Sequence, residues 1–269
     1  MSVEPKTAFR DPLLEVPIEI VPLPSGGRVY PESSALHGKT ELEIYEMGTR
    51  QEDILTSPAL AKKGTMLTEL MRSCLVDRDI DPAEMIVGDR YALLAAIRIT
   101  GYGPHLTGKV TCSECDAETE RTFNLAGFNV RRLTIDPVAQ GQNLFSFQLP
   151  RSKRTVEFRF MTGRDEEDMH VAEQRQRKLG LTGAASTNIT SALVRTVVSV
   201  DGINDPARVA NFVRSMNAGD SLALRSHMGE NQPGVEFKEE QTCAACGHVE
   251  EVDCPMDMGF LWPKLKRQN

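Results

Sequence analysis

Two pairs of cysteines carry the clearest chemistry in this sequence. Cys112 and Cys115 lie in the segment TCSEC, Cys243 and Cys246 lie in TCAAC, and residues 116–242 separate the two pairs. A Cys-x-x-Cys turn lets two thiolates face one metal ion, and two such turns complete a tetrahedral shell of four sulfur ligands. The repeated spacing therefore predicts one Zn²⁺ bound by Cys112, Cys115, Cys243 and Cys246. Because four thiolates leave no position for a catalytic water, the predicted zinc is structural.

A redox role is the alternative for a Cys-x-x-Cys pair, and it would place one pair at the start of a helix in a βαβ unit. Here each pair follows a strand-like run and leads into another, which favours zinc. His248 and Cys254 lie near the second pair and could replace a ligand. We expect His248 to lie beside the site or on the surface, and Cys254, which precedes Pro255, to be a buried thiol.

Other catalytic signals are absent from the sequence. The five histidines (His37, His105, His170, His227 and His248) are scattered without ligand spacing, and no nucleophile elbow, phosphate-binding loop, dinucleotide-binding turn or HExxH helix occurs. The acidic run at residues 165–168 is interpreted as charge that complements the positive start of a helix. We expect no enzymatic activity.

The elements that would position the cysteines begin with an extended N-terminal arm. Prolines at positions 22, 24 and 31 exclude a helix, and Ser25-Gly26-Gly27 indicates a tight turn. The arm, residues 11–31, is too apolar for a free tail, so we expect much of its apolar surface to lie against another protein. Packing of the segment PLPSGGRVYP on its own domain is the alternative. The side chains concerned are Leu13, Leu14, Val16, Ile18, Ile20, Val21 and Leu23.

A change of hydrophobic period after residue 48 indicates helices. Thr49–Glu52 reads as a capping box, Ser57-Pro58 and Asp81-Pro82 as helix starts, and Asp89 as the start of a helix that ends in glycines. The helix from Thr65 places Cys74 on its core side. Farther along, alternating residues at 143–150 and 154–161 predict a hairpin with the basic run Arg151–Arg154 at its tip. Four helices are predicted next, over residues 164–179, 187–200, 206–216 after an Asp205 N-cap, and 221–228.

The predicted fold class is α+β, with an extended N-terminal arm, a small helical domain, and a zinc ribbon that carries an inserted hairpin-plus-helices domain. The expected divisions are residues 1–48 for the arm and strands, 49–104 for the helical domain and 105–128 for the first half of the ribbon. Residues 129–232 form the insertion, and 233–269 form the second half of the ribbon with a tail.

Composition limits the function classes. The chain has 269 residues, 40% of them hydrophobic, and a formal net charge of −7. An acidic balance argues against an extended phosphate-binding face, so no nucleic-acid partner is expected. No segment approaches the roughly 20 apolar residues that a membrane span needs, so no membrane association is expected either.

Three segments together resemble a known family: LPSGGRVYP, GDRYALLAAIRITGYG and the Cys-x-x-Cys pair that follows them. They are similar to the baseplate proteins of T-even-type contractile-tailed bacteriophages, a group that includes a baseplate hub assembly protein. The match covers roughly residues 20–125, and the closing cysteine pair keeps the pattern.

The resemblance implies a structural component or assembly factor of a phage tail baseplate that acts through protein–protein packing. It further implies other tail proteins as partners, several copies in one assembly, synthesis in the host cytoplasm and a place in the virion baseplate. A zinc-ribbon accessory protein of nucleic acids or transcription is the alternative, favoured by the cysteine pairs and disfavoured by the acidic charge. A Cys-x-x-Cys oxidoreductase is a third hypothesis.

Overall fold

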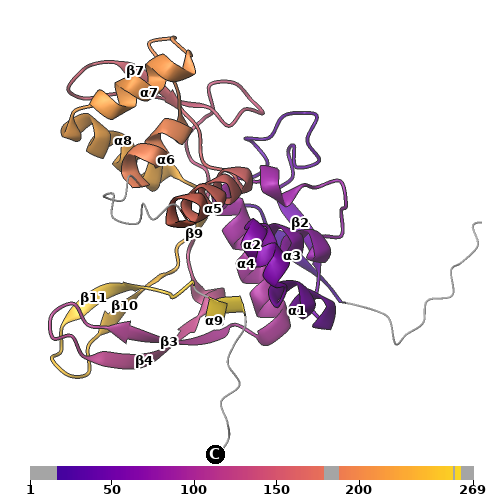
Figure 1. The fold of residues 1–269 in the computed structure, drawn as a ribbon. Coiled ribbons are helices and arrows are strands. Elements are labelled where there is room, and N and C mark those ends of the chain that lie inside the picture. Colours follow the sequence, from indigo (N-terminus) through magenta and orange to yellow (C-terminus); the bar gives the residue numbers. More distant parts are fainter. Residues whose placement is uncertain (1–16, 179–187, 257, 262–269) are drawn as a thin grey trace, which may run out of the picture.

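The computed structural model describes residues 17–178, 188–256 and 258–261, and within these ranges the protein is a mixed α+β structure with small antiparallel sheets. Figure 1 shows three neighbouring regions: helices near the N-terminus, two long hairpins, and a group of helices around a small sheet. One continuous cluster of buried apolar side chains runs through them. Among the described residues, no helix combines the length and the apolar character that a membrane crossing requires.

The N-terminal region pairs an extended segment with a group of helices. Strand β1 (Ile18–Pro22) lies antiparallel to β2 (Glu41–Tyr45), and Ile20 stands opposite Glu43. Alternation of side chains across this ribbon buries Leu42 and Ile44 and exposes Ile18 and Ile20. The helices that follow are α1 (Thr49–Leu55), α2 (Pro58–Lys63), α3 (Met66–Cys74), the 3₁₀ turn η2 (Pro82–Glu84) and α4 (Val87–Tyr102).

The expectation that much of the arm's apolar surface lies against another protein is wrong for its second half, which packs on its own chain. Val21 and Leu23 are buried in the core of this chain, together with Val29 and Tyr30. The prolines allow this because the Leu23 amide, which is free to donate, still bonds to the carbonyl of Thr40 at 2.8 Å. Ile18 and Ile20 remain exposed, whereas Leu13, Leu14 and Val16 lie outside the described residues.

Two helix starts differ from their predicted positions. Helix α1 has Gly48 as its N-cap, and the side chain of Gln51, rather than that of Glu52, accepts from the Gly48 amide at 3.0 Å. Helix α4 begins at Val87, so Asp89 lies inside its first turn and is fully buried. The predicted ends are confirmed for α4, which stops at Gly103, and Cys74 lies on the buried side of α3 as expected.

Two hairpins carry the cysteine pairs. Strands β3 (His105–Thr111) and β4 (Glu118–Asn124) form the first hairpin, and β10 (Lys238–Thr242) and β11 (Val249–Asp253) form the second. The prediction that each pair joins two strands is confirmed. The short turn η3 (Leu125–Gly127) follows the first hairpin, and α9 (Met258–Leu261) follows the second.

The middle of the chain forms a three-stranded sheet with helices. The predicted hairpin is confirmed as β6 (Phe145–Gln148) and β7 (Thr155–Phe158), with the basic run in its turn. The remaining elements are β5 (Val130–Arg131), α5 (Gly163–Lys178), α6 (Asn188–Thr196), β8 (Val197–Val200), α7 (Pro206–Ser215), α8 (Ala218–Asn231) and β9 (Gly234–Val235).

Two helix predictions in this region were partly wrong. Residues 197–200 form strand β8, which pairs with β7, because the β-branched run Val-Val-Ser-Val fits the buried side of this sheet better than a helix. Helix α8 begins at Ala218, earlier than predicted, because the side chain of Asn217 caps it by accepting from the Asp220 amide at 2.9 Å.

Candidate metal centre

The four predicted cysteines meet where the tips of the two hairpins come together. The Sγ atoms of Cys112 and Cys246 lie 3.8 Å apart, and those of Cys115 and Cys243 lie 3.7 Å apart. All four sulfur atoms lie within 4.8 Å of one another. Cys112 and Cys243 are buried and Cys115 and Cys246 are exposed, so the cluster lies at the surface with one cysteine of each pair facing inward.

These separations fit a tetrahedral metal site. In a regular tetrahedron with metal–sulfur bonds of about 2.3 Å, neighbouring sulfur atoms are about 3.8 Å apart. A disulfide would require a sulfur–sulfur distance of about 2.05 Å, so the cysteines are not paired in that way. The arrangement could therefore hold one metal ion such as zinc between two hairpins.

The two cysteine turns repeat the same backbone. In the first, the Cys112 amide donates to Ala117 O at 3.1 Å and the Asp116 amide donates to Cys112 O at 3.0 Å. In the second, the equivalent bonds are Cys243 N to His248 O at 2.7 Å and Gly247 N to Cys243 O at 2.9 Å. Asp116 and Gly247 follow the second cysteine of each pair and both have positive φ, of 55° and 75°. The matched turns aim both sulfur atoms of a pair at the same point.

Backbone amides also favour thiolate at this site. The amides of Cys246 and Ala245 donate to the Cys243 sulfur and lower the pKa of Cys243 to about 6. The amides of Cys115 and Glu114 likewise favour thiolate at Cys112, but desolvation and the neighbouring Cys243 sulfur raise the pKa of Cys112. For Cys115, the Ala117 amide works against the increase, but the neighbouring sulfur atoms, Cys246 foremost, raise the pKa to about 12. A divalent cation would take the place of those shared protons.

Polar contacts between the hairpins hold the cysteine turns together. The Ser113 amide in the first turn donates to the Glu250 carboxylate at 3.1 Å, and Arg121 of β4 donates to the Thr242 carbonyl at 2.5 Å. Deeper between the hairpins, Gln241 is buried and reaches Thr119. These contacts fix how the two hairpins lie against each other beside the four sulfur atoms.

The other residues considered as ligands lie apart from the cluster. Cys254 is a buried thiol, as predicted, and burial raises its pKa to about 11. His248 contributes its backbone carbonyl to the second turn, and no histidine joins a group of three or more ligands among the described residues. His227 is a packing residue rather than a ligand, because it stacks on Phe147 with 4.3 Å between the ring centroids.

The first turn of α4 is a second site of dense contacts, one that the sequence did not reveal. Three consecutive residues there, Gly88, Asp89 and Arg90, reach three distant segments. Asp89 is fully buried and accepts hydrogen bonds from the Ser25 amide (2.9 Å), the Ser25 hydroxyl (2.6 Å) and the Tyr30 hydroxyl (2.6 Å). Burial raises the pKa of Asp89 to about 6, although these hydrogen bonds oppose the increase.

Gly88 and Arg90 serve the same turn of α4. A Cβ atom on Gly88 would lie 1.6 Å from the Pro233 carbonyl oxygen, so only glycine permits the contact between α4 and the segment of β9. Arg90, also buried, donates to Glu166 of α5 at 3.2 Å and to Thr68 of α3 at 3.3 Å. The turn therefore joins the N-terminal loop, β9 and α5 to one helix.

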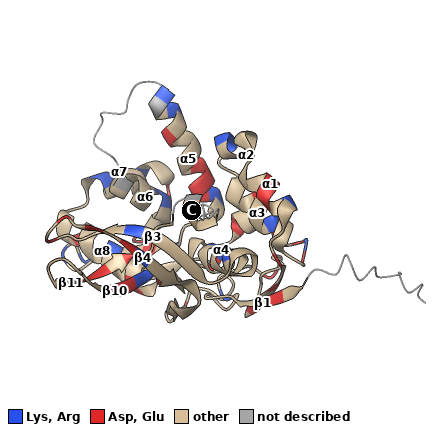
Figure 2. Cartoon of the chain, turned by 90° about the horizontal axis from the view of Figure 1, so that it is seen from below, with Lys and Arg blue, Asp and Glu red and all other residues tan. Residues whose placement is uncertain are grey.

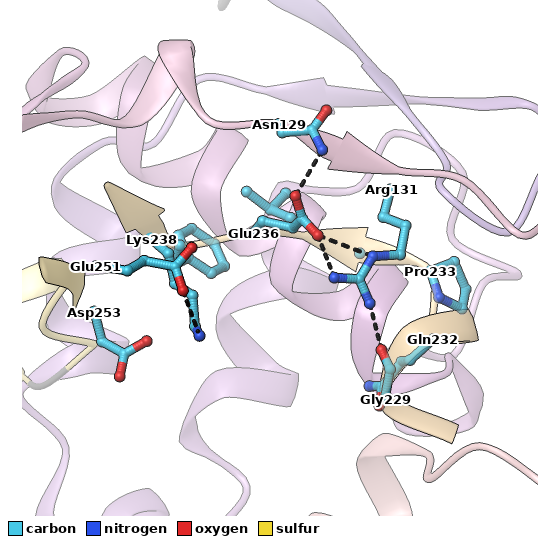
Figure 3. A pocket seen from close by; sticks show the side chains of 12 residues that line it. Asn129, Arg131, Gly229, Gln232, Pro233, Glu236, Lys238, Glu251 and Asp253 are labelled. Carbon is cyan, nitrogen blue, oxygen red and sulfur yellow. Dashed lines mark hydrogen bonds and ion pairs between the residues drawn. The ribbon is translucent and has the colours of Figure 1, made fainter. Parts of the chain in front are cut away.

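A polar cavity of about 440 Å³ lies between β9 and the second hairpin. Figure 3 shows Glu236 bound by Asn129 and Arg131 on one side, and Lys238 paired with Glu251 on the other. Arg131 also donates to the Gly229 carbonyl at the end of α8. Because these groups satisfy one another, the cavity is a structural seam between α8, β5 and the hairpin.

Fold and site together define a mixed α+β protein whose four-cysteine cluster could hold a metal ion at the junction of two hairpins. The chain belongs to the T4 bacteriophage base plate protein family, whose family model matches residues 37–258. This range includes α4 and both cysteine pairs. It extends toward the C-terminus beyond roughly residues 20–125, over which the sequence resemblance was identified. No curated protein and no solved structure matches the chain significantly.

Proposed function

We propose that the protein is a structural component or assembly factor of a contractile-tail baseplate. In this proposal Cys112, Cys115, Cys243 and Cys246 bind one structural Zn²⁺, and the two hairpins form a zinc ribbon that carries residues 129–232 as an inserted domain. Membership of the baseplate family is the observation that carries the role, and the sulfur–sulfur separations of 3.7 and 3.8 Å support the zinc.

Protein–protein contacts are the proposed mode of action. The partners are other tail proteins, the chain is made in the host cytoplasm, and its place is the virion baseplate. A closed shell of four thiolates supplies rigidity rather than catalysis, because it offers no open coordination position. The zinc would fix the two hairpins as one rigid arm on the helical body.

A nucleic-acid accessory role fits the surface of the hairpins poorly. On the outer face of the second hairpin, Glu240 stands directly opposite Glu251, and Asp253 follows two residues along. A phosphate backbone would meet repulsion there rather than the basic face that such proteins use.

Metal analysis and tail assembly together test the proposal. Purified protein should contain about one zinc per chain, and the double variant Cys112→Ser/Cys243→Ser should contain none. A matched control is Cys74→Ala, which removes a buried thiol of α3 outside the cluster and should keep the zinc.

In a host that carries a phage lacking the wild-type gene, the wild-type chain should restore infectious tails and the double variant should fail. Metal retained in the double variant, or two ions per wild-type chain, would refute the single site. If the wild-type chain binds zinc normally but tails assemble equally well without the chain, the baseplate role is refuted.

A further inference from the structure

A small apolar hollow opens beside α7, at the far side of the molecule from the N-terminal ribbon. It measures about 180 Å³ and is lined by Val200, Ile203, Val209 and Phe212, with Arg154 and Arg208 also at its wall. The volume suits one branched aliphatic side chain. An apolar lining with guanidinium groups at its wall suits an apolar side chain that is flanked by carboxylates.

One of the two guanidinium groups at the hollow has no ion-pair partner among the described residues. Arg154 pairs with Asp201 at 2.6 Å. Asp205 caps α7, where its carboxylate accepts from the Arg208 amide. The guanidinium of Arg208 has no ion pair within the described part of the chain. The same holds for Arg151 and Lys153 in the exposed turn between β6 and β7.

The outer face of the β1–β2 ribbon has the complementary character. Ile18 and Ile20 are 51% and 60% exposed, and the register places Glu43 directly opposite Ile20. Glu41 lies on the same face, and neither glutamate has an ion pair among residues 17–178, 188–256 and 258–261. Arg78 lies over the Tyr45 ring at 6.0 Å and donates to the Arg72 carbonyl.

One chain cannot bring these two surfaces together. Figure 2 shows β1 and α7 at opposite sides of the molecule, and Figure 1 places α7 far from the N-terminal ribbon as well. Two copies can do so, and because the contacting surfaces differ, the contact is heterologous and can be repeated from copy to copy.

We propose that the β1–β2 face of one copy docks into the α7 hollow of a second copy. Ile20 occupies the apolar hollow, and Glu43 lies beside Arg208. The apolar floor favours a protein occupant over a nucleic acid, because a phosphate backbone has nothing to bury there. This inference rests on the surfaces themselves and is independent of the proposed zinc.

A charge exchange between two separate variants tests the contact. Arg208→Glu and Glu43→Arg should each lower self-association at least about tenfold, because each places like charges across the contact. Mixing the two variants should restore association, since each mixed contact is either wild-type or exchanged. Sedimentation velocity at low salt, over a wide range of concentrations, measures both effects.

Two further variants separate this contact from general attraction. Ile20→Ala should weaken association by removing the anchor, whereas Arg225→Glu, the same charge change on an exposed residue of α8, should leave it unchanged. A wild-type chain that stays monomeric at every concentration overturns the proposal, even if it binds DNA through Arg208. The proposal also fails if the mixture stays dissociated, or if Arg225→Glu weakens association as much as Arg208→Glu.

Discussion

The hydroxyl of Tyr30 should contribute measurably to stability, although it lies far from the cysteine cluster. It donates to the Asp89 carboxylate at 2.6 Å and accepts from the Ile86 amide at 3.1 Å, and both residues are buried. The substitution Tyr30→Phe keeps the ring and removes both hydrogen bonds. A lost bond to a charged group costs about 1.5–3 kcal/mol, and an unpaired buried amide adds roughly 1–3 kcal/mol.

Because these contributions overlap, we expect Tyr30→Phe to lower the free energy of unfolding by about 2–4 kcal/mol at pH 8. The loss should be smaller below the Asp89 pKa of about 6, where the carboxyl group is protonated and needs fewer donors. The sign follows from burial, which raises the folded-state pKa above the unfolded value of about 3.9. Asp89 therefore stabilises the fold most at low pH, and that contribution disappears as the pH rises through 6.

Urea unfolding at pH 5 and pH 8 measures the effect. Tyr45→Phe is the matched control, because within the described residues its hydroxyl forms no hydrogen bond, and it should change stability by less than about 0.5 kcal/mol. A Tyr30→Phe variant that loses under about 0.5 kcal/mol, or that loses equally at both pH values, would refute this account of the Asp89 contacts.

Three further changes test other contacts. Gly88→Ala should prevent folding or cost several kcal/mol, because its Cβ would lie 1.6 Å from the Pro233 oxygen. The control Gly229→Ala changes a helical site with open space and should be neutral or stabilise by about 0.5–1 kcal/mol. Thermal unfolding compares the two variants. Deletion of residues 1–24 should give an aggregating chain, since it removes β1 and the buried Val21 and Leu23, while deletion of residues 1–16 leaves every described contact in place; size-exclusion chromatography separates the outcomes. Chelation should loosen the hairpins near residues 112–117 and 243–248 and leave α3 and α4 folded, which hydrogen exchange would show as faster exchange confined to those turns.

The cysteine cluster was accessible from the sequence because its signal is local and repeated. Two identical spacings between strand-like runs predict two turns of the same shape, and the matched hydrogen bonds at Cys112 and Cys243 bear out that shape. Hairpins and amphipathic helices were legible for the same reason. Strand β8 was not, because Val197–Val200 is helical or extended according to its neighbours, and only pairing with β7 decides between the two.

Long-range contacts were the part that local patterns could not reveal. Asp89 looked like a helix start because aspartate commonly caps helices, yet its partners Ser25 and Tyr30 lie some sixty residues earlier in the chain. The arm was misread for the same reason. Its prolines and apolar side chains are equally compatible with a partner protein and with this chain's own core, and only the contacts of Val21 and Leu23 distinguish them.

Helix α4 explains how cysteine pairs so distant in sequence meet at one point. At its C-terminal end, the buried Arg98 donates to Gly103 and His105 carbonyls at 2.7 and 3.1 Å, which fixes the start of the first hairpin. At its N-terminal end, Gly88 packs on the segment that leads into the second hairpin. Closing a loop as long as residues 116–242 would otherwise cost about 4 kcal/mol of chain entropy.

Aromatic packing joins the second hairpin to the same helix. Phe237, which lies just before β10, contacts Tyr91 of α4 with ring centroids 6.4 Å apart and Phe128, after the first hairpin, at 5.7 Å. Both hairpins are thus placed by contacts at their bases, while the sulfur atoms lie at their tips. These contacts within the body of the protein already offset the entropic cost of bringing the two cysteine pairs together. Most of the binding energy of a metal ion at the tips therefore remains available to hold the hairpins rigid.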